Sequence, residues 1–328
     1  MIEVRPFAES DIDDASTLFA AAYAEARAVL PLMPDRGDAR QFAAEKLAAI
    51  SGRPGFAAVS GSRMVGYMVE LFTTDSFMGS PTGSATELFT SASVPENRER
   101  IHQLIYAETA RSWIERGFHA HEISYFATDE VLSRTYFRLG FGMTHFQFFR
   151  DLSLPEAASG ATFEASPKGL RIEYATSEAQ VSHLDREHHA FYPNPPLFWL
   201  PHGPFDSAVD RVSSGEMEII MAVIDDEPVG YFKLRKGSAE SEVFAHPGNG
   251  QIKSAYVRPD YRRHGIGAAL LSETVQWARR NNLERLYVEG ESANTHGGNF
   301  WVRHFRPAQY AVRRCVDTRI NPSFYSET

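Results

Sequence analysis

A short glycine-rich segment carries the clearest chemical signal in the sequence. Residues 257–268 read VRPDYRRHGIGA, so a strand-like run ends and a helix-like run begins near Gly265. Gly265 and Gly267 lack a Cβ, which lets the backbone turn tightly and approach a ligand closely. Consecutive amide N–H groups at a helix N-terminus bind phosphate through hydrogen bonds and the helix dipole. Because Arg262 and Arg263 add positive charge, we expect the ligand to be a pyrophosphate.

Three nucleotide-binding patterns compete for this segment. A Walker loop requires GxxxxGK[ST], and the segment contains no such string. A Rossmann fingerprint requires GxGxxG, but Leu270 stands where the third glycine belongs. The third pattern, RxxGxG, is matched by Arg262, Gly265 and Gly267, and an amphipathic run follows it. In this run apolar side chains recur at helical spacing from Leu270 to Ala278.

An internal repeat indicates which elements position the loop. Residues 56–67 and 220–231 are similar, and Gly66 and Gly230 are 164 positions apart. The same offset relates further identical residues, namely Pro95 and Pro259, Arg98 and Arg262, Trp113 and Trp277, Phe141 and Phe305, and Arg150 and Arg314. A register shared over so many positions predicts a duplicated domain of about 150 residues.

The repeat sets the expected domain boundaries and fold class. We expect one domain over residues 1–152, a linker rich in Ser, Ala, Pro and Gly over 153–169, and a second domain over 170–328. Each domain is expected to fold alone. The second half is expected to hold the following elements in order: a first strand at 170–174, a helix at 177–190, a hairpin of strands 218–224 and 228–234, a strand at 251–257, a helix at 267–281, a strand at 285–289, and a last helix and strand. This order predicts an α/β fold with a mixed sheet.

The segment from Ile252 to Gly267 resembles the central strand and pyrophosphate loop of the GNAT superfamily of acyl-CoA-dependent N-acetyltransferases. Leu286–Glu289, Asn294 and Phe300-Trp301 are similar to the next strand and the last helix region of that family. The first half joins the resemblance through the repeat. The resemblance implies two tandem GNAT-like domains, each a mostly antiparallel mixed sheet that is flanked by helices and splayed at its central strands.

The resemblance also implies a cosubstrate and its contacts. Acetyl-CoA is the expected cosubstrate, with pantetheine in the gap between the splayed strands and the Val257 N–H facing the thioester carbonyl. The residues expected to bind it are Ala255, Val257, Arg262, Arg263, His264, Gly265, Ile266, Gly267, Ala268, Asn294 and Trp301. The expected reaction is direct attack of an amine on the thioester, which requires that the amine lose a proton.

The sequence departs from the family at both positions where an acid or base is common. Many relatives carry Glu three residues before the position of Val257, where this chain has Ser254. Many carry a Tyr in the final helix, and the repeat places Phe300 opposite Tyr136 there. Neither Phe300 nor the adjacent Trp301 can donate a proton as a phenol does.

Other side chains are therefore candidates for acid–base work. Glu289 and Glu291 alternate along a strand end, and Tyr256 lies in the central strand. His296 follows Asn294, and the pair His188-His189 precedes an aromatic, proline-rich stretch where relatives often build the acceptor pocket. Each of these residues also has an ordinary structural explanation, as a solvated strand end or as packing.

The first half lacks the glycine loop. The repeat offset puts Ile101 and Gln103 opposite the two loop glycines, and β-branched Ile101 disfavours positive φ. Glu96 and Glu99 place negative charge where phosphates would lie. We therefore expect that the first domain does not bind acyl-CoA and that it supports the second or lines its acceptor site.

Composition limits the remaining function classes. The 328 residues carry 33 Lys and Arg against 42 Asp and Glu, a net charge of −9 without a basic block, which disfavours nucleic acid and membrane partners. The single Cys315 allows no internal disulfide, and the histidine clusters at 119–121 and 188–189 lack metal-site spacing, so no metal is expected. The first residues are acidic and do not resemble a signal peptide, so the expected location is the cytoplasm.

Two function classes and one subfamily remain open. The sequence favours an N-acetyltransferase acting on a small-molecule amine. The alternative is a non-catalytic acyl-CoA-binding or sensor protein, which Ser254 and Phe300 favour. Mycothiol synthases are tandem relatives of similar length, but no acceptor-site residue argues for that activity.

Overall fold

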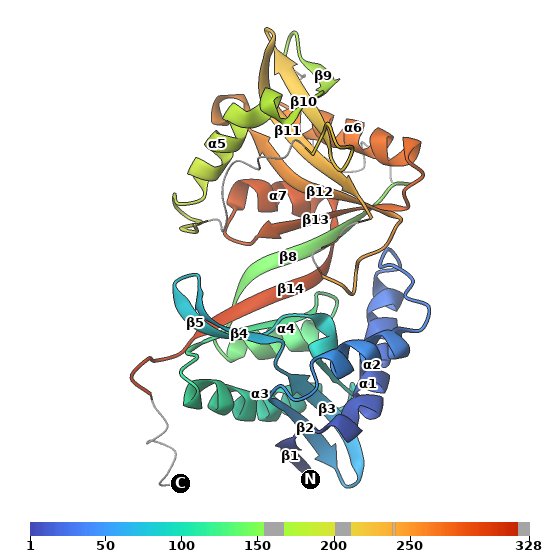
Figure 1. Ribbon diagram of the computed structural model, residues 1–328, viewed down its shortest axis with the longest axis vertical. Coiled ribbons are helices and arrows are strands. Elements are labelled where there is room, and N and C mark those ends of the chain that lie inside the picture. Colours follow the sequence, from blue (N-terminus) through green and yellow to red (C-terminus); the bar gives the residue numbers. More distant parts are fainter. Residues whose placement is uncertain (154–166, 201–210, 238, 240, 321–328) are drawn as a thin grey trace. The chain divides into compact units, whose positions relative to one another are not determined.

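The computed structural model describes residues 1–153, 167–200, 211–237, 239 and 241–320. The chain forms two compact units (Figure 1). The first unit comprises Met1–Phe146, Ser241–Val243 and Pro307–Thr328, and the second comprises Gln147–Glu240 and Phe244–Arg306.

The first unit combines two sets of paired strands with four α-helices in its described part. One sheet has the order β1-β2-β3-β6, and a second set runs β4-β5-β7-β14, in which β5 and β7 are parallel. The elements are β1 (Ile2–Pro6), α1 (Ile12–Val29), α2 (Ala39–Ala49), β2 (Gly55–Ser60), β3 (Arg63–Val69), β4 (Phe72–Phe77), β5 (Ser80–Ala85), β6 (Ser91–Ser93), α3 (Arg98–Glu115), β7 (Ala120–Phe126), α4 (Glu130–Arg138) and β14 (Arg306–Cys315).

The second unit contains the strand order β8-β13-β12-β11-β10-β9. Its elements are the end of β8 (Gly142–Asp151), β9 (Arg171–Tyr174), α5 (Ser182–Phe191), β10 (Glu218–Ile224), β11 (Glu227–Lys236), β12 (Asn249–Val257), α6 (Ile266–Arg280), β13 (Arg285–Glu291) and α7 (Thr295–His304). Short 3₁₀ turns precede α5 at Glu178–Val181 and α6 at Pro259–Tyr261. The predicted α/β fold with a mixed, mostly antiparallel sheet is confirmed, and the element order of the second half agrees with it.

The hairpin of β10 and β11 follows directly from its turn residues. Ile224 pairs with Glu227, so only Asp225 and Asp226 lie between the strands. Both adopt positive φ, at 51° and 64°. A two-residue turn with positive φ at both positions matches the right-handed twist of the strands, and Asp tolerates that backbone region well.

The internal repeat is present in the backbone as well as in the sequence. The β2–β3 ladder shifts register between Ala58 and Val59, and the β10–β11 ladder shifts 164 positions later, between Ala222 and Val223. The pair Gly66–Ser93 on β3 and β6 likewise corresponds to the pair Gly230–Val257 on β11 and β12. The two halves therefore share strand register in detail.

Each unit includes a strand segment from the other sequence half. β14 lies near the C-terminus, yet it pairs antiparallel with β7 of the first unit, from Gln309 opposite Phe126 to Cys315 opposite Ala120. Residues 147–151 of β8 belong to the second unit, where β8 neighbours β13. The compact units thus differ from the halves 1–152 and 170–328 in their final strands. The predicted linker lies mostly outside the described residues, which omit 154–166.

Helix packing in the second unit fixes the elements around the glycine loop. The apolar residues predicted along α6 are buried, and Leu270, Leu271 and Val275 each have at most 3% of their surface exposed. Burying a side chain of this kind contributes about 1.5–3 kcal/mol, so this face holds α6 against its sheet. On α5, Leu184 packs in a cluster that includes Tyr231 of β11.

Candidate active site

A cavity of about 850 Å³ lies in the second unit, at the end of β12. All eleven residues that the sequence predicted as acetyl-CoA contacts line it, and so does Tyr256. The other lining residues are His188, Phe191, Phe232, Tyr261, Thr295, His296, Gly297, Asn299, Phe300 and Arg303. Among these described residues no Asp or Glu lines the cavity, while three Arg residues do. The wall is therefore suited to an anionic ligand.

The cavity opens where two parallel strands separate. β12 and β13 pair from Asn249 opposite Arg285 to Ile252 opposite Val288. Beyond that point β12 continues to Val257, still paired with β11. The Arg258 N–H donates to the Val229 carbonyl at 2.9 Å. Because successive amides of a strand point to opposite edges, the Val257 N–H points to the unpaired edge, where an extended ligand can bind.

The loop after β12 presents a row of unused amide groups. Arg263 and Gly265 have positive φ, at 68° and 79°, and α6 starts directly after them. The first backbone hydrogen bond of α6 runs from Ala269 to the Gly265 carbonyl. Within the described chain the amides of residues 264–268 make no hydrogen bond. Free N–H groups in this geometry form an anion-binding nest at the positive end of the helix dipole.

Arg262 supports the loop from inside. Its Nε donates to the Val257 carbonyl at 2.9 Å, and its guanidinium lies over the rings of Phe191 and Tyr256. These contacts hold the side chain between the strand end and α5. Arg262 therefore connects the nest to the aromatic end of the cavity and adds positive charge there.

Three further predicted contacts have clear structural roles. The Asn294 side chain accepts a hydrogen bond from the Gly297 N–H at 3.0 Å and so caps α7. Gly267 faces Phe300, because a Cβ at position 267 would lie 3.3 Å from that ring. Trp301 packs beside Phe300 and Phe232. The structure thus brings the loop and α7 together across one wall of the cavity.

The predicted acid–base candidates divide into two groups. Tyr256 lines the cavity and donates a hydrogen bond to Glu187 at 3.3 Å, and burial raises its pKa. His188 and His296 also line the cavity. Glu289 and Glu291 are not among its lining residues. Burial raises the pKa of Glu291, which accepts hydrogen bonds from the side chains of Tyr192 and Asn294.

Sequence reasoning missed a polar network behind His188. The Tyr231 hydroxyl donates to Asp185 Oδ1 at 2.5 Å, and Lys233 Nζ lies 2.6 Å from Asp185 Oδ2. Lys233 is only 8% exposed although it lies on a strand. A lysine in an otherwise apolar strand pattern was the one available signal, since buried cations require a partner.

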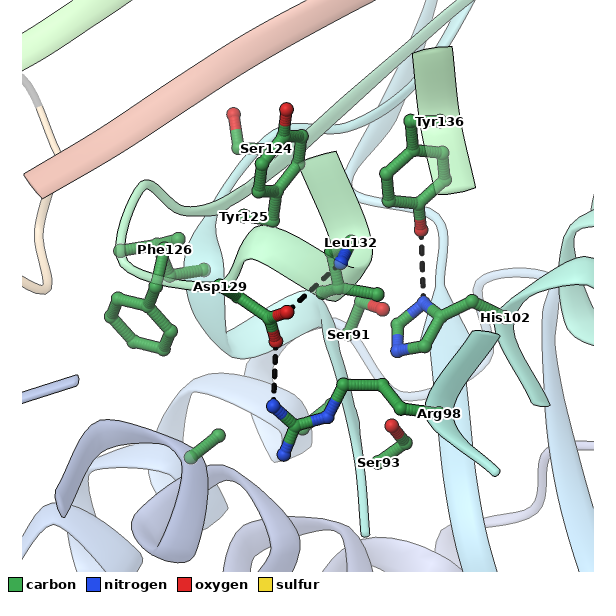
Figure 2. A pocket seen from close by; sticks show the side chains of 13 residues that line it. Ser91, Ser93, Arg98, His102, Ser124, Tyr125, Phe126, Asp129, Leu132 and Tyr136 are labelled. Carbon is green, nitrogen blue, oxygen red and sulfur yellow. Dashed lines mark hydrogen bonds and ion pairs between the residues drawn. The ribbon is translucent and has the colours of Figure 1, made fainter. Parts of the chain in front are cut away.

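The matching place in the first unit is almost closed (Figure 2). Its pocket measures about 20 Å³, enough for about one water molecule. Arg98 pairs with Asp129 at 2.7 Å, and the His102 Nδ1 atom lies 3.0 Å from the Tyr136 hydroxyl, as Figure 2 shows. Ile101 is buried, and a Cβ on Gly66 would lie 2.5 Å from its methyl group. This pocket is too small for a pyrophosphate.

The described part of the chain holds neither a metal-site cluster nor a membrane-spanning helix. No group of three or more His, Cys, Asp or Glu side chains is placed to hold a metal ion there. None of the described helices combines the length and apolar character required to cross a membrane.

Comparison with known proteins identifies relatives of the second half. The model of the Acetyltransferase (GNAT) family matches residues 181–305. Streptothricin acetyltransferase A of Bacillus subtilis is 30% identical over 119 residues, which cover 36% of this chain and 61% of that relative. The match therefore spans less than two thirds of the relative's length.

Solved structures resemble nearly the whole chain. A GCN5-related N-acetyltransferase from Sphaerobacter thermophilus matches with a TM-score of 0.57 and 14% identity, over 96% of this chain and 95% of that one. A tandem GNAT protein from the clavulanic acid biosynthesis pathway matches with a TM-score of 0.49 and 14% identity, over 96% and 98% of the two chains. At 14% identity the likeness to the Sphaerobacter thermophilus structure concerns the fold.

Proposed function

The model of the Acetyltransferase (GNAT) family matches residues 181–305, and from this premise we propose that the second unit transfers an acetyl group from acetyl-CoA to a small-molecule amine. The observation that carries the proposal is the gathering of the loop, the strand edge and α7 around one cavity. The acceptor class follows the matched relative, whose name gives it an acetyltransferase activity on streptothricin.

The proposed cosubstrate fits three features of the cavity. The free amides of residues 264–268 suit a pyrophosphate. The unpaired edge of β12 suits the amide groups of pantetheine, which bind as an added strand does. The Val257 N–H then suits the thioester oxygen, where it stabilises the negative charge that develops during attack.

The acceptor is proposed to enter at the aromatic end of the cavity, beside Phe191 and Tyr256. The amine nitrogen forms a bond to the thioester carbon, the carbon–sulfur bond breaks, and the proton of the amine must leave. Under this proposal the phenol of Tyr256, which lines the cavity, contacts the acceptor. Glu289 and Glu291 stay predictions as acid–base groups, without support from the cavity wall.

A coupled binding and turnover experiment tests the proposal. Isothermal titration should show acetyl-CoA binding, and a thiol-release assay across a panel of amines, with streptothricin included, should show turnover for at least one. Gly267→Val serves as the site variant, because Gly267 lines the cavity and lies in the loop proposed to bind the pyrophosphate. Acetyl-CoA binding that survives this variant would contradict the proposed cradle.

A non-catalytic acyl-CoA-binding protein is the second candidate. The observation that favours it is Phe300, an apolar ring on the cavity wall where the repeat has Tyr136. Tight acetyl-CoA binding with no thiol release for any amine would support this candidate over the enzyme.

A further inference from the structure

A line of polar side chains leads from a buried lysine to the cavity wall. Lys233 pairs with Asp185, Asp185 accepts the Tyr231 hydroxyl, and the Tyr231 oxygen lies 3.2 Å from His188 Nδ1. Ser254 Oγ lies 3.2 Å from the same oxygen. Only His188 of this group lines the cavity. The line therefore ends at a single imidazole that a ligand can reach.

The hydrogen bonds fix the tautomer of His188. A phenol has one proton, and Tyr231 gives it to Asp185 at 2.5 Å. The Tyr231 oxygen can then only accept, and the Ser254 hydroxyl, 3.4 Å from Nδ1, donates to that oxygen at 3.2 Å. His188 Nδ1 therefore carries the hydrogen and donates it to the Tyr231 oxygen. Nε2 consequently holds a lone pair, and within the described chain it has no hydrogen-bond partner. Asp185 thus orients His188 through Tyr231 and Nδ1, and Nε2 is left to accept a proton.

Packing holds the imidazole ring in place and keeps it neutral. The ring stacks on Tyr256 at 5.2 Å and contacts Tyr192 at 5.3 Å. The pKa of His188 is lowered to about 4; burial is the largest cause, His189, Lys233 and Arg262 also lower it, and Asp185 raises it. A neutral histidine keeps its Nε2 lone pair at physiological pH.

We propose that His188 is the base of the reaction, and that Tyr231, Asp185 and Lys233 are positioning residues that hold its Nδ1 proton and present Nε2 to the acceptor amine. The proposal rests on the proposed acetyl transfer. As the carbon–nitrogen bond forms and the carbon–sulfur bond breaks, the amine proton passes to Nε2. The same proton then neutralises the leaving thiolate, so His188 returns to its neutral state and atoms and charge balance.

Kinetics of the full chain test the catalytic half of the proposal. His188→Ala should lower kcat by about 100-fold or more, the usual contribution of a general base, while the Kd of acetyl-CoA stays unchanged. Added imidazole should restore part of the activity. His183→Gln, on the same helix and outside the cavity wall, is the matched control and should retain full activity. A His188→Ala enzyme with wild-type kcat would overturn the proposal.

The positioning half has its own readout. Tyr231→Phe keeps the ring and removes the hydroxyl, so it should lower kcat without changing the KM of acetyl-CoA. Without the Tyr231 oxygen to accept the Nδ1–H, His188 should also populate the Nε2-protonated tautomer. Nitrogen-15 NMR of the unaltered protein should show His188 protonated on Nδ1 and neutral above about pH 5, since its pKa is about 4. An Nε2-protonated ring would overturn the proposal whatever the turnover assay gives, whereas absent acetyl-CoA binding would contradict only the proposed function.

Discussion

A substitution at Gly267 gives the most direct test of the proposed acetyl-CoA site. Its backbone N–H belongs to the free nest, and a Cβ there would lie 3.3 Å from the Phe300 ring. Valine at this position would crowd both Phe300 and the approach of a phosphate. We expect Gly267→Val to weaken acetyl-CoA binding at least tenfold, measured by isothermal titration, with little change in melting temperature.

A matched glycine provides the control for this prediction. A Cβ added to Gly142 would meet no other atom within 4 Å, so Gly142→Val should leave acetyl-CoA binding as it is. Equal loss of affinity in both variants would point to general destabilisation instead of a local cradle.

The raised pKa of buried Glu87 makes the free energy of unfolding of the first unit depend on pH. Burial raises its pKa to about 7, although the Ser241 hydroxyl donates to it at 2.8 Å. Because the folded pKa lies above the unfolded value of 4.5, the folded state binds the proton more tightly. Its contribution to the free energy of unfolding is thus present below pH 4.5 and falls as pH rises to 7, by at most about 3 kcal/mol.

The Glu87→Gln variant isolates that contribution. Glutamine keeps the size and stays neutral, so the variant should be more stable than the original chain at about pH 8 and close to it at about pH 5. Buried His102 and His121, whose pKa values are lowered to about 3 and 4, act in the opposite direction but are common to both proteins. Equal melting-temperature differences at the two pH values would refute the assignment.

The loop residues were predictable and the network behind them was not. RxxGxG, its flanking strand and its helix lie within a continuous stretch, so spacing alone placed Arg262, Gly265 and Gly267 on one wall. Asp185 and Tyr231, in contrast, are 46 positions apart and meet only because α5 packs on β11. No local pattern reports such a contact, and a hydroxyl–carboxylate pair has no sequence spacing of its own.

At the scale of elements, the two repeated halves share strand register, but their corresponding helices α3 and α6 begin differently. α6 begins after Gly265 in the left-handed region, and α3 begins after Asn97 with φ of 57°. By the repeat offset, however, α3 starts four residues earlier than α6, so the Ile101 N–H, opposite Gly265, already donates to the Asn97 carbonyl at 3.0 Å. Ile101 and His102 are both buried, and the pocket that His102 lines measures about 20 Å³. The described part of the first unit therefore lacks both the free amides and the space that a phosphate needs.

This difference predicts one acetyl-CoA per chain. The cavity of the second unit measures about 850 Å³ and its counterpart about 20 Å³. Isothermal titration should give a stoichiometry near one, and the Gly267→Val protein should show no second site of unaltered affinity. A stoichiometry near two would mean that the first unit opens to admit the ligand.

Two substitutions of Asn294 should separate its effect on stability, as the cap of α7, from its effect on acetyl-CoA binding. Its side chain caps α7 and also lines the cavity. Asn294→Ala should lower stability by about 1 kcal/mol through loss of the cap. Asn294→Ser keeps a capping oxygen and adds no charge beside Glu291, so it should preserve most of the stability while loss of the amide from the cavity wall weakens acetyl-CoA binding. A stability loss equal to that of alanine would contradict the capping role.

Element order was largely predictable because each half alternates β-rich runs with amphipathic helices. The main departure is in the first half, where the counterpart of β12 is interrupted. A 3₁₀ turn at Leu88–Thr90 separates β5 from β6, and the Thr90 hydroxyl bonds to the Glu87 carbonyl at 2.6 Å. Such side-chain to backbone bonds compete with strand pairing, and the repeat could not reveal them because β12 of the second half runs without this interruption.

At the scale of the whole molecule, strand exchange decides which fragments can fold. Sequence alone suggested that cutting in the 153–169 linker would release two self-sufficient halves. The second unit, however, includes residues 147–151 of β8, and the first unit includes β14 from Pro307 onward. A fragment of residues 165–328 would lack the strand beside β13 and would carry β14 without its partner β7.

The fragment of residues 142–306 should instead behave as the folded unit. It retains β8 beside β13 and omits all but the first residue of β14, so the β8 edge next to β14 is the one edge that this cut opens. The fragment 165–328 instead opens the β13 edge and also carries β14 without β7. Because exposed strand edges promote aggregation, we expect 165–328 to be the less soluble of the two fragments and 142–306 to remain in solution. The soluble fragment should bind acetyl-CoA, since the cavity residues all lie between positions 188 and 303. Size-exclusion chromatography and titration of both fragments measure this directly. A soluble 165–328 that binds as tightly as 142–306 would show that the halves, and not the strand-exchanged units, are the folding domains.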